Sequence, residues 1–186
     1  MKNIFKLLLA CAFVFSLATP LLAKDPKTED EVMTALNSTN AKVVFNALLV
    51  MEKKYPTSAP GLAKAKSLLT DDRATVREKA ARVLGALHAD LSDDDLKKIS
   101  AMLDSSDPKE VQQALLALRG LEAKSTIPKI LPALKNADPF VKRDACRTLA
   151  VLGDKSVIPD IQPLTQDPDP KVQTDANDAI FALKNK

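Results

Sequence analysis

Apolar residues recur at intervals of three and four along most of the chain after residue 28, which is the spacing that gives a helix one buried stripe. Ala145, Leu149 and Leu152 form one such stripe. No segment shows the alternation of apolar and polar residues typical of a strand. The pattern predicts helices near 29–37, 41–54, 59–69, 74–88, 92–103, 108–121, 125–136, 139–152, 156–166 and 170–184.

The helical pattern repeats along the chain. The pair Asp107-Pro108 recurs as Asp138-Pro139 and Asp169-Pro170, each 31 residues after the last. Weaker copies, spaced by 33 or 34 residues, extend toward the N-terminus. A fixed period of this length indicates a stacked array of helix pairs. We therefore expect an all-α fold, a right-handed α-α superhelix of about ten helices in five antiparallel pairs.

The repeated residues also predict where the helices of each unit begin. In an Asp-Pro pair, the carboxylate can accept hydrogen bonds from the first free amides, and proline loses nothing at the first helical position. The second helices begin differently, because Ser92 and Asp95 can form a capping box, with Ser125 and Ser156 as expected caps later in the chain. Glycines near the ends of the first helices predict left-handed caps or close packing: Gly85, Gly120 and Gly153.

Residues 1–23 have the pattern of a cleavable signal peptide. Lys2 and Lys6 are followed by an apolar run that ends at the small residue Ala23. We expect cleavage after Ala23, which leaves residues 24–186 as a single repeat domain located in the periplasm or outside the cell.

Two other interpretations of this N-terminal run are weaker. Pro20 interrupts it, and no later segment approaches the roughly 20 apolar residues that a membrane span needs. The sequence before Cys11 resembles the lipobox of bacterial lipoproteins, but the apolar region continues to Leu22. We therefore expect neither a membrane span nor a lipid anchor at Cys11.

Charge and composition exclude several functions. The formal charge of +3 falls to +1 without the two lysines of the leader, and only four aromatic residues follow it. A nucleic-acid binder needs a basic surface and aromatic stacking platforms, so we expect no nucleic-acid partner. Cys146 has no possible intramolecular partner after the leader, and it aligns with Ala81 and Leu115, which favours a buried residue over a nucleophile.

The C-terminal half resembles a known family. The segment 138–145, followed by 149–154 and 157–159, is similar to a HEAT repeat of the short phycobilisome-lyase type, and the resemblance extends over residues 28–184. It implies that an acidic loop residue lies near a basic residue of the following helix. The implied pairs are Asp72 with Arg77 and Asp138 with Lys142, and Gln112 and Gln173 depart from the pattern.

The resemblance implies architecture more than activity, since such repeats occur in lyases, hydroxylases and passive scaffolds. The metal-dependent hydroxylases of this type use several His-Glu pairs, whereas this chain has one histidine, His88. Attachment of a bilin would take place in the wrong compartment for an exported protein. The acids Asp93, Asp94 and Asp95 lie in a first helical turn, where they favour the helix dipole. We therefore expect no metal, no cofactor and no catalytic residues.

Two rows of residues suggest a binding surface on the second helices. They appear when these helices are aligned on Leu62, Leu96, Ile127 and Ile158 as equivalent buried positions. The first row is basic and lies two positions later: Lys64, Lys98 and Lys129, ending at Asp160. The second is apolar and lies six positions later: Leu68, Met102, Ala133 and Leu164. We expect both rows on the inner, concave surface.

This arrangement leaves two interpretations open. The lysines can be an ordinary solvated face beside an apolar row that belongs to the core, or the two rows can form a groove for an acidic, partly apolar segment. The sequence favours a non-catalytic adaptor or scaffold that binds a protein partner on its concave face. The alternatives are an accessory or lyase-like subunit of an enzyme system and a structural component of the cell envelope.

Overall fold

The computed structural model describes residues 26–186, so the predicted signal peptide lies outside the described residues. Within this range the chain is helical and contains no strand, as expected. Nowhere between residues 26 and 186 is a helix long and apolar enough to cross a membrane.

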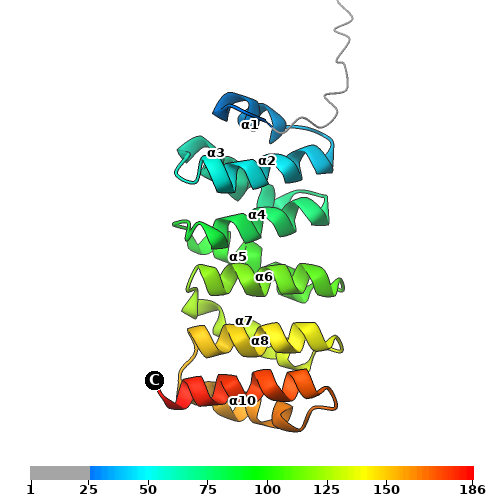
Figure 1. Cartoon of the computed structure of the whole chain (residues 1–186), viewed down its shortest axis with the longest axis vertical. Helices are drawn as coiled ribbons and strands as arrows, with labels where there is room; N and C mark the ends of the chain where they lie inside the picture. The colour runs from blue at the N-terminus through cyan, green and yellow to red at the C-terminus, as the bar shows by residue number, and fades with distance from the viewer. Residues whose placement is uncertain (1–25) are drawn as a thin grey trace, which may run out of the picture.

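Five long helices stack on one another along the longest axis of the molecule (Figure 1). They are α2 (Ala41–Lys54), α4 (Ala74–Ala86), α6 (Pro108–Gly120), α8 (Pro139–Leu152) and α10 (Pro170–Lys184). Their inward-facing residues form a continuous core, in which Leu84, Leu118 and Leu149 are fully buried.

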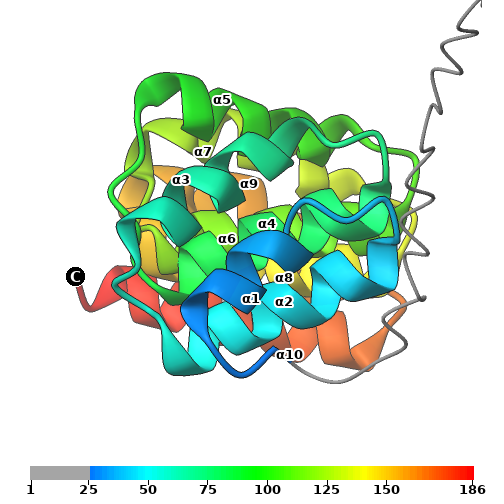
Figure 2. The same ribbon diagram turned by 90° about the horizontal axis from the view of Figure 1, so that it is seen from above.

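Five shorter helices alternate with the long ones along the chain. They are α1 (Glu29–Ala35), α3 (Ala59–Ser67), α5 (Asp93–Ala101), α7 (Ile127–Ile130) and α9 (Ile158–Ile161). Figure 2 shows α3, α5, α7 and α9 in one layer and the long helices in the other. Each short helix packs against the long helix that follows it, which gives five pairs and confirms the predicted all-α solenoid.

Two short helices are shorter than predicted. The predicted helix 125–136 consists of one α-helical turn, α7, between the 3₁₀ segments Lys124–Thr126 and Leu131–Lys135, and the predicted helix 156–166 is divided in the same way around α9. Pro132 and Pro163 lie just after these α-helical turns. A proline has no amide hydrogen and its ring crowds the carbonyl four residues earlier, so the chain continues as 3₁₀ helix.

Most of the predicted caps are present. Asp138 accepts a hydrogen bond from the amide of Phe140 at 2.7 Å, and Asp107 and Asp169 cap α6 and α10 in the same way. The capping box of Ser92 and Asp95 opens α5.

The two predicted serine caps are wrong. No side chain caps α7 or α9, so Ser125 and Ser156 do not have that role. At the second site, Asp154 accepts from the amide of Ser156 at 2.8 Å instead. A 3₁₀ turn precedes both α-helical turns, and its carbonyls already occupy amides that a cap would otherwise satisfy.

The glycines permit close packing and do not adopt left-handed conformations. A Cβ atom on Gly85 would lie 2.6 Å from the Cα atom of Ala117, and one on Gly120 would lie 2.6 Å from the carbonyl oxygen of Gly85. The left-handed residues at the ends of α4 and α6 are His88, with φ of 47°, and Glu122, with φ of 51°. Of the two predicted roles, left-handed caps and close packing, the glycines of α4 and α6 have close packing.

The two layers are not stacked equally tightly. Neighbouring long helices pack directly on one another, whereas the short helices contact their neighbours mainly through the 3₁₀ segments that extend them. In a curved solenoid the more tightly stacked layer is the inner one. The packing therefore favours the long helices, and not the predicted second helices, as the inner surface.

Candidate functional site

The predicted basic row lies on the short-helix layer, but its members differ in environment. Lys64 is half-buried, and Lys129 is exposed beside a cleft between α5 and α7. Lys98 is bound by two acids of its own helix, with Nζ 2.6 Å from Asp94 and 3.6 Å from Asp95. The hydrogen bond with Asp94 is the main reason that the pKa of Lys98 is raised. The row therefore contains one cation that is already paired.

The predicted apolar row is not a surface. Leu68, Met102 and Leu164 are 5%, 4% and 9% exposed, so they belong to the core. The residues used to align the second helices are only half-buried, and the fully buried positions lie three residues later: Ala65, Ile99, Ile130 and Ile161. Because the buried stripe is shifted in this way, the predicted apolar row lies in the interior and not beside the stripe.

The exposed large apolar residues lie on the other layer. They are Phe45, Phe140, Val151 and Phe181, which are between 39% and 71% exposed. All four occupy positions 2, 5, 12 or 13 of a long helix, counted from its first residue. These positions lie within about 60° of one direction on a helix of 3.6 residues per turn. We call positions 2, 5, 6, 9, 12 and 13 of the five long helices the long-helix face.

The long-helix face is also basic. Its basic side chains are Lys42, Lys53, Lys79, Arg82, Lys109, Arg119, Arg143, Arg147 and Lys171, and its acidic side chains are Glu52, Glu78, Asp144, Asp175 and Asp178. These are nine basic groups against five acidic groups. The remaining described residues contain more acidic than basic side chains. The positive charge of the described chain is therefore concentrated on one side.

Ion pairs cross the seams between the first long helices, a seam being the line of contact between two neighbours. Between α2 and α4, Glu52 accepts from Lys79 at 3.0 Å and from Arg82 at 3.2 Å, and Lys79 also lies 5.4 Å from the ring centre of Phe45. Burial lowers the pKa of Lys79 in spite of Glu52. Between α4 and α6, Lys109 and Glu78 are 2.9 Å apart.

The last seam is held by a carboxylate shared between two arginines. Asp175 of α10 lies 2.6 Å from Nε of Arg143 and 3.0 Å from Arg147, both on α8. The guanidinium of Arg143 also lies 5.8 Å from the ring centre of Phe140. Asp175 therefore faces α8 and is buried.

The charge pairs implied by the family resemblance have other partners. Asp138 caps its own helix, and Lys142 binds Asp167. Arg77 donates to the carbonyl of Asp72 at 3.1 Å but forms its ion pair with Glu110, at 2.7 Å. The pairs link consecutive repeats, so they depend on how the repeats stack and not on spacing within one repeat.

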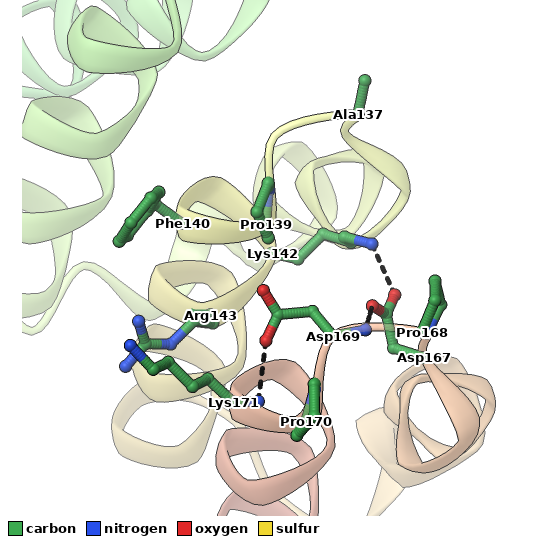
Figure 3. Close-up of a pocket in the computed structure, with 10 residues that line it drawn as sticks. All are labelled: Ala137, Pro139, Phe140, Lys142, Arg143, Asp167, Pro168, Asp169, Pro170 and Lys171. Carbon is green, nitrogen blue, oxygen red and sulfur yellow. Dashed lines mark hydrogen bonds and ion pairs between the residues drawn. The ribbon is translucent and has the colours of Figure 1, made fainter.

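A cavity of about 620 Å³ opens at the N-terminal ends of α8 and α10 (Figure 3). On one side Lys142 reaches Asp167, and on the other lie Phe140, Arg143 and Lys171. The ammonium of Lys171 has no partner among residues 26–186. The cavity therefore continues the basic, aromatic character of the long-helix face to its edge.

The described residues show neither a cluster of metal ligands nor an activated thiol. Residues 26–186 contain no cluster of His, Cys, Asp or Glu suited to a metal ion. Cys146 is fully buried, as the alignment predicted, and burial raises the pKa of its thiol to about 12. The thiol of Cys146 is therefore not an activated nucleophile. What the long-helix face offers a ligand is hydrogen bonds, charge and apolar contacts.

Comparison with known proteins agrees with this architecture. The family model for HEAT repeats matches residues 127–185. This segment is therefore similar to HEAT repeats. The match confirms the family suggested by the residues of the C-terminal half, and among curated proteins no sequence matches that of the chain.

Solved structures extend the similarity to most of the chain. The complex of CpcE and CpcF of phycocyanin lyase from Nostoc sp. PCC7120 matches with a TM-score of 0.75 and 20% identity, over 91% of this chain and 70% of the other. An engineered protein matches with a TM-score of 0.64 and 23% identity, over 84% and 81%. A designed armadillo repeat protein in complex with the peptide (KR)4 matches with a TM-score of 0.60 and 15% identity, over 82% and 80%. At these identities the similarity shows the fold.

Proposed function

We propose that this chain is a non-catalytic protein-binding scaffold, and that its long-helix face holds an acidic, partly apolar segment of another protein. The observation that carries the proposal is the position of its exposed large apolar residues, which all lie on the same face as the excess of basic groups. Aromatic residues and arginine are the side chains most enriched in protein interfaces. We also place the scaffold in the periplasm or outside the cell, on the basis of its predicted signal peptide.

Charge complementarity determines the kind of partner. A face with nine basic and five acidic groups favours an acidic segment and disfavours a basic one. The exposed rings of Phe140, near the start of α8, and Phe181, near the end of α10, add apolar contact area. An extended or helical segment that alternates acidic and apolar residues would satisfy both features.

Phe140→Ala combined with Phe181→Ala tests this proposal. We expect capture of the partner, by cross-linking in the native cell envelope, to weaken at least tenfold, because buried aromatic residues dominate interface energies. The double substitution Lys155→Ala and Gln162→Ala, at exposed sites in the segments flanking α9, is the matched control and should leave capture unchanged. Helicity should be the same in all variants.

The predicted basic row remains a second proposed surface on the same scaffold. Reversing the charge of Lys64, Lys98 and Lys129 together would abolish capture if the partner lies on the short-helix layer. Loss in this variant, with full capture by the phenylalanine variant, would contradict the long-helix face. Full capture by both variants would contradict the binding proposal on either layer.

A second candidate function is an accessory or lyase-like subunit of an enzyme system. It is favoured by the TM-score of 0.75 to the complex of two phycocyanin lyase proteins. The absorbance spectrum and metal content of the purified protein separate the two candidates. A stoichiometric chromophore or metal would contradict a bare scaffold.

A further inference from the structure

The seam between α6 and α8 differs from the other seams on the long-helix face. Ion pairs within 3.2 Å cross the α2–α4, α4–α6 and α8–α10 seams. Among residues 26–186, no ion pair crosses from α6 to α8 on this face. Positions 5 and 6 of α6 are Gln112 and Gln113, where α4 has the charged residues Glu78 and Lys79. Among the described residues, the third of the four seams is therefore the one that no ion pair crosses on this face.

Two complementary charges face this seam without a bond between them. Arg119 and Asp144 occupy the helix positions at which Glu52 and Lys79 form an ion pair two repeats earlier. The guanidinium of Arg119 has no hydrogen bond or ion pair within the described chain. The carboxylate of Asp144 has only Arg147 of its own helix, at 3.7 Å.

The charge around this seam is positive. Arg147, Arg119 and Arg143 all act on Asp144, and Asp175 is the only other acid among the groups that do. Burial nevertheless raises the pKa of Asp144, so its carboxylate is poorly solvated and only weakly compensated. Arg143 and part of Arg147 are already bound to Asp175. The guanidinium of Arg119 keeps all its donors free.

We infer that the α6–α8 seam is the anion-binding subsite of the long-helix face, where a carboxylate side chain of the partner accepts hydrogen bonds from Arg119 and Arg147. This inference rests on the proposed function and names the group that the face recognises. Arginine forms strong, directional pairs with carboxylates. Here both guanidiniums act on Asp144, the donors of Arg119 are all free, and Nη1 of Arg147 has only its 3.7 Å contact with Asp144.

An apolar neighbour of that carboxylate has a place to pack. Val151 lies one turn after Arg147 on α8 and is 47% exposed, and Leu116, at position 9 of α6 on the same face, is half-buried. A cationic side chain would meet three guanidiniums at the same position. The seam therefore takes an acidic residue followed or preceded by an apolar one.

Two synthetic peptides test the inference by NMR titration of the full-length protein: one alternates glutamate and leucine, and the other alternates glutamine and leucine. We expect only the glutamate peptide to shift the Nε–H signals of Arg119 and Arg147. Arg119→Gln should weaken its binding about tenfold, the value of one hydrogen bond to a charged group. Lys155→Gln removes an exposed cation outside the long-helix face, and should change binding less than twofold.

Several results would overturn the inference. They are equal binding of the two peptides, no binding of either, an equal effect of the Lys155 and Arg119 variants, or stronger binding of inorganic phosphate than of the glutamate peptide. A carboxyl group of Asp144 that titrates below its ordinary range in the free protein would show that Arg119 closes the seam itself. None of these results touches the capture experiment with the phenylalanine variants, so the two proposals fail separately.

Discussion

At the scale of single residues, the carboxylates of this chain are held in two opposite ways. Burial acts to raise the pKa of Asp167, but the ammonium of Lys142 and the amide of Asp169 outweigh it and hold the pKa below its usual value. Burial also raises the pKa of Asp144, and the arginines around it do not compensate. The first carboxylate stabilises the fold when it is ionised, whereas the second is less costly when it is protonated.

Substitution of each carboxylate by the isosteric amide should have different effects. Asp167→Asn should destabilise the protein by about 2 kcal/mol at pH 7, because it leaves Lys142 without its charged partner. A depressed pKa contributes stability above the unfolded value, and that stability is lost as the pH falls through the folded value, so this difference should shrink below about pH 4. Urea unfolding at both pH values measures it.

Asp144→Asn is the matched comparison. A raised pKa means that the charged form is disfavoured in the folded state, so the stability associated with this group falls as the pH rises through its folded pKa. Replacement by Asn should therefore cause no loss at pH 7. A loss equal to that of Asp167→Asn would contradict the distinction between the two sites.

At the scale of helices, the close packing of α4 on α6 depends on the absence of a side chain at Gly85. Gly85→Ala should destabilise the protein by about 2 kcal/mol, because the new methyl group would meet the backbone of Ala117, which cannot move aside without separating the two helices. Denaturant unfolding measures this.

Gly61→Ala provides the control for that change. Its new methyl group would meet the side chains of Met51 and Ser58, at 2.8 and 2.9 Å, and a flexible methionine can move. Alanine also favours a helix over glycine by roughly 1 kcal/mol. Gly61→Ala should therefore be much less destabilising than Gly85→Ala, and equal losses would show that close packing of α4 on α6 is not the cause.

The helices themselves were predictable because local chemistry determines them. The predicted ranges 139–152 and 170–184 coincide with α8 and α10, since an Asp-Pro start and an apolar stripe define each helix. The 3₁₀ segments around α7 and α9 were missed, although Pro132 and Pro163 were visible in the sequence. In these segments the loss of one amide outweighs a favourable apolar pattern.

The binding surface was less predictable than the helices. The buried stripe lies three residues later than the alignment assumed, which moved Leu68, Met102 and Leu164 from an expected surface into the core. The long-helix face was missed because its ion pairs join residues about 30 positions apart, such as Glu52 with Lys79 and Arg143 with Asp175. Only the stacking of the repeats decides these pairings. The long-helix face could have been recognised in the sequence from the aromatic residues at otherwise polar positions of the long helices.

At the scale of the whole molecule, the fold is a linear array in which each pair contacts mainly its neighbours. Deletion of residues 154–186 would remove α9 and α10 and leave Arg143 and Arg147 without Asp175. We expect the shortened chain to keep its remaining helices but to unfold at lower urea concentration and with a smaller dependence on urea, because less surface is buried. Complete loss of helicity would show that the array folds only as a unit.

Separation of the repeats in this array can be measured through the buried thiol of Cys146. The side chain is fully buried in α8, and its pKa of about 12 leaves almost no thiolate at neutral pH. A thiol-modifying reagent can therefore react only when the C-terminal repeats separate. The rate of labelling therefore measures the rate of that opening. The experiment needs no engineered cysteine, because Cys146 is already present among the described residues.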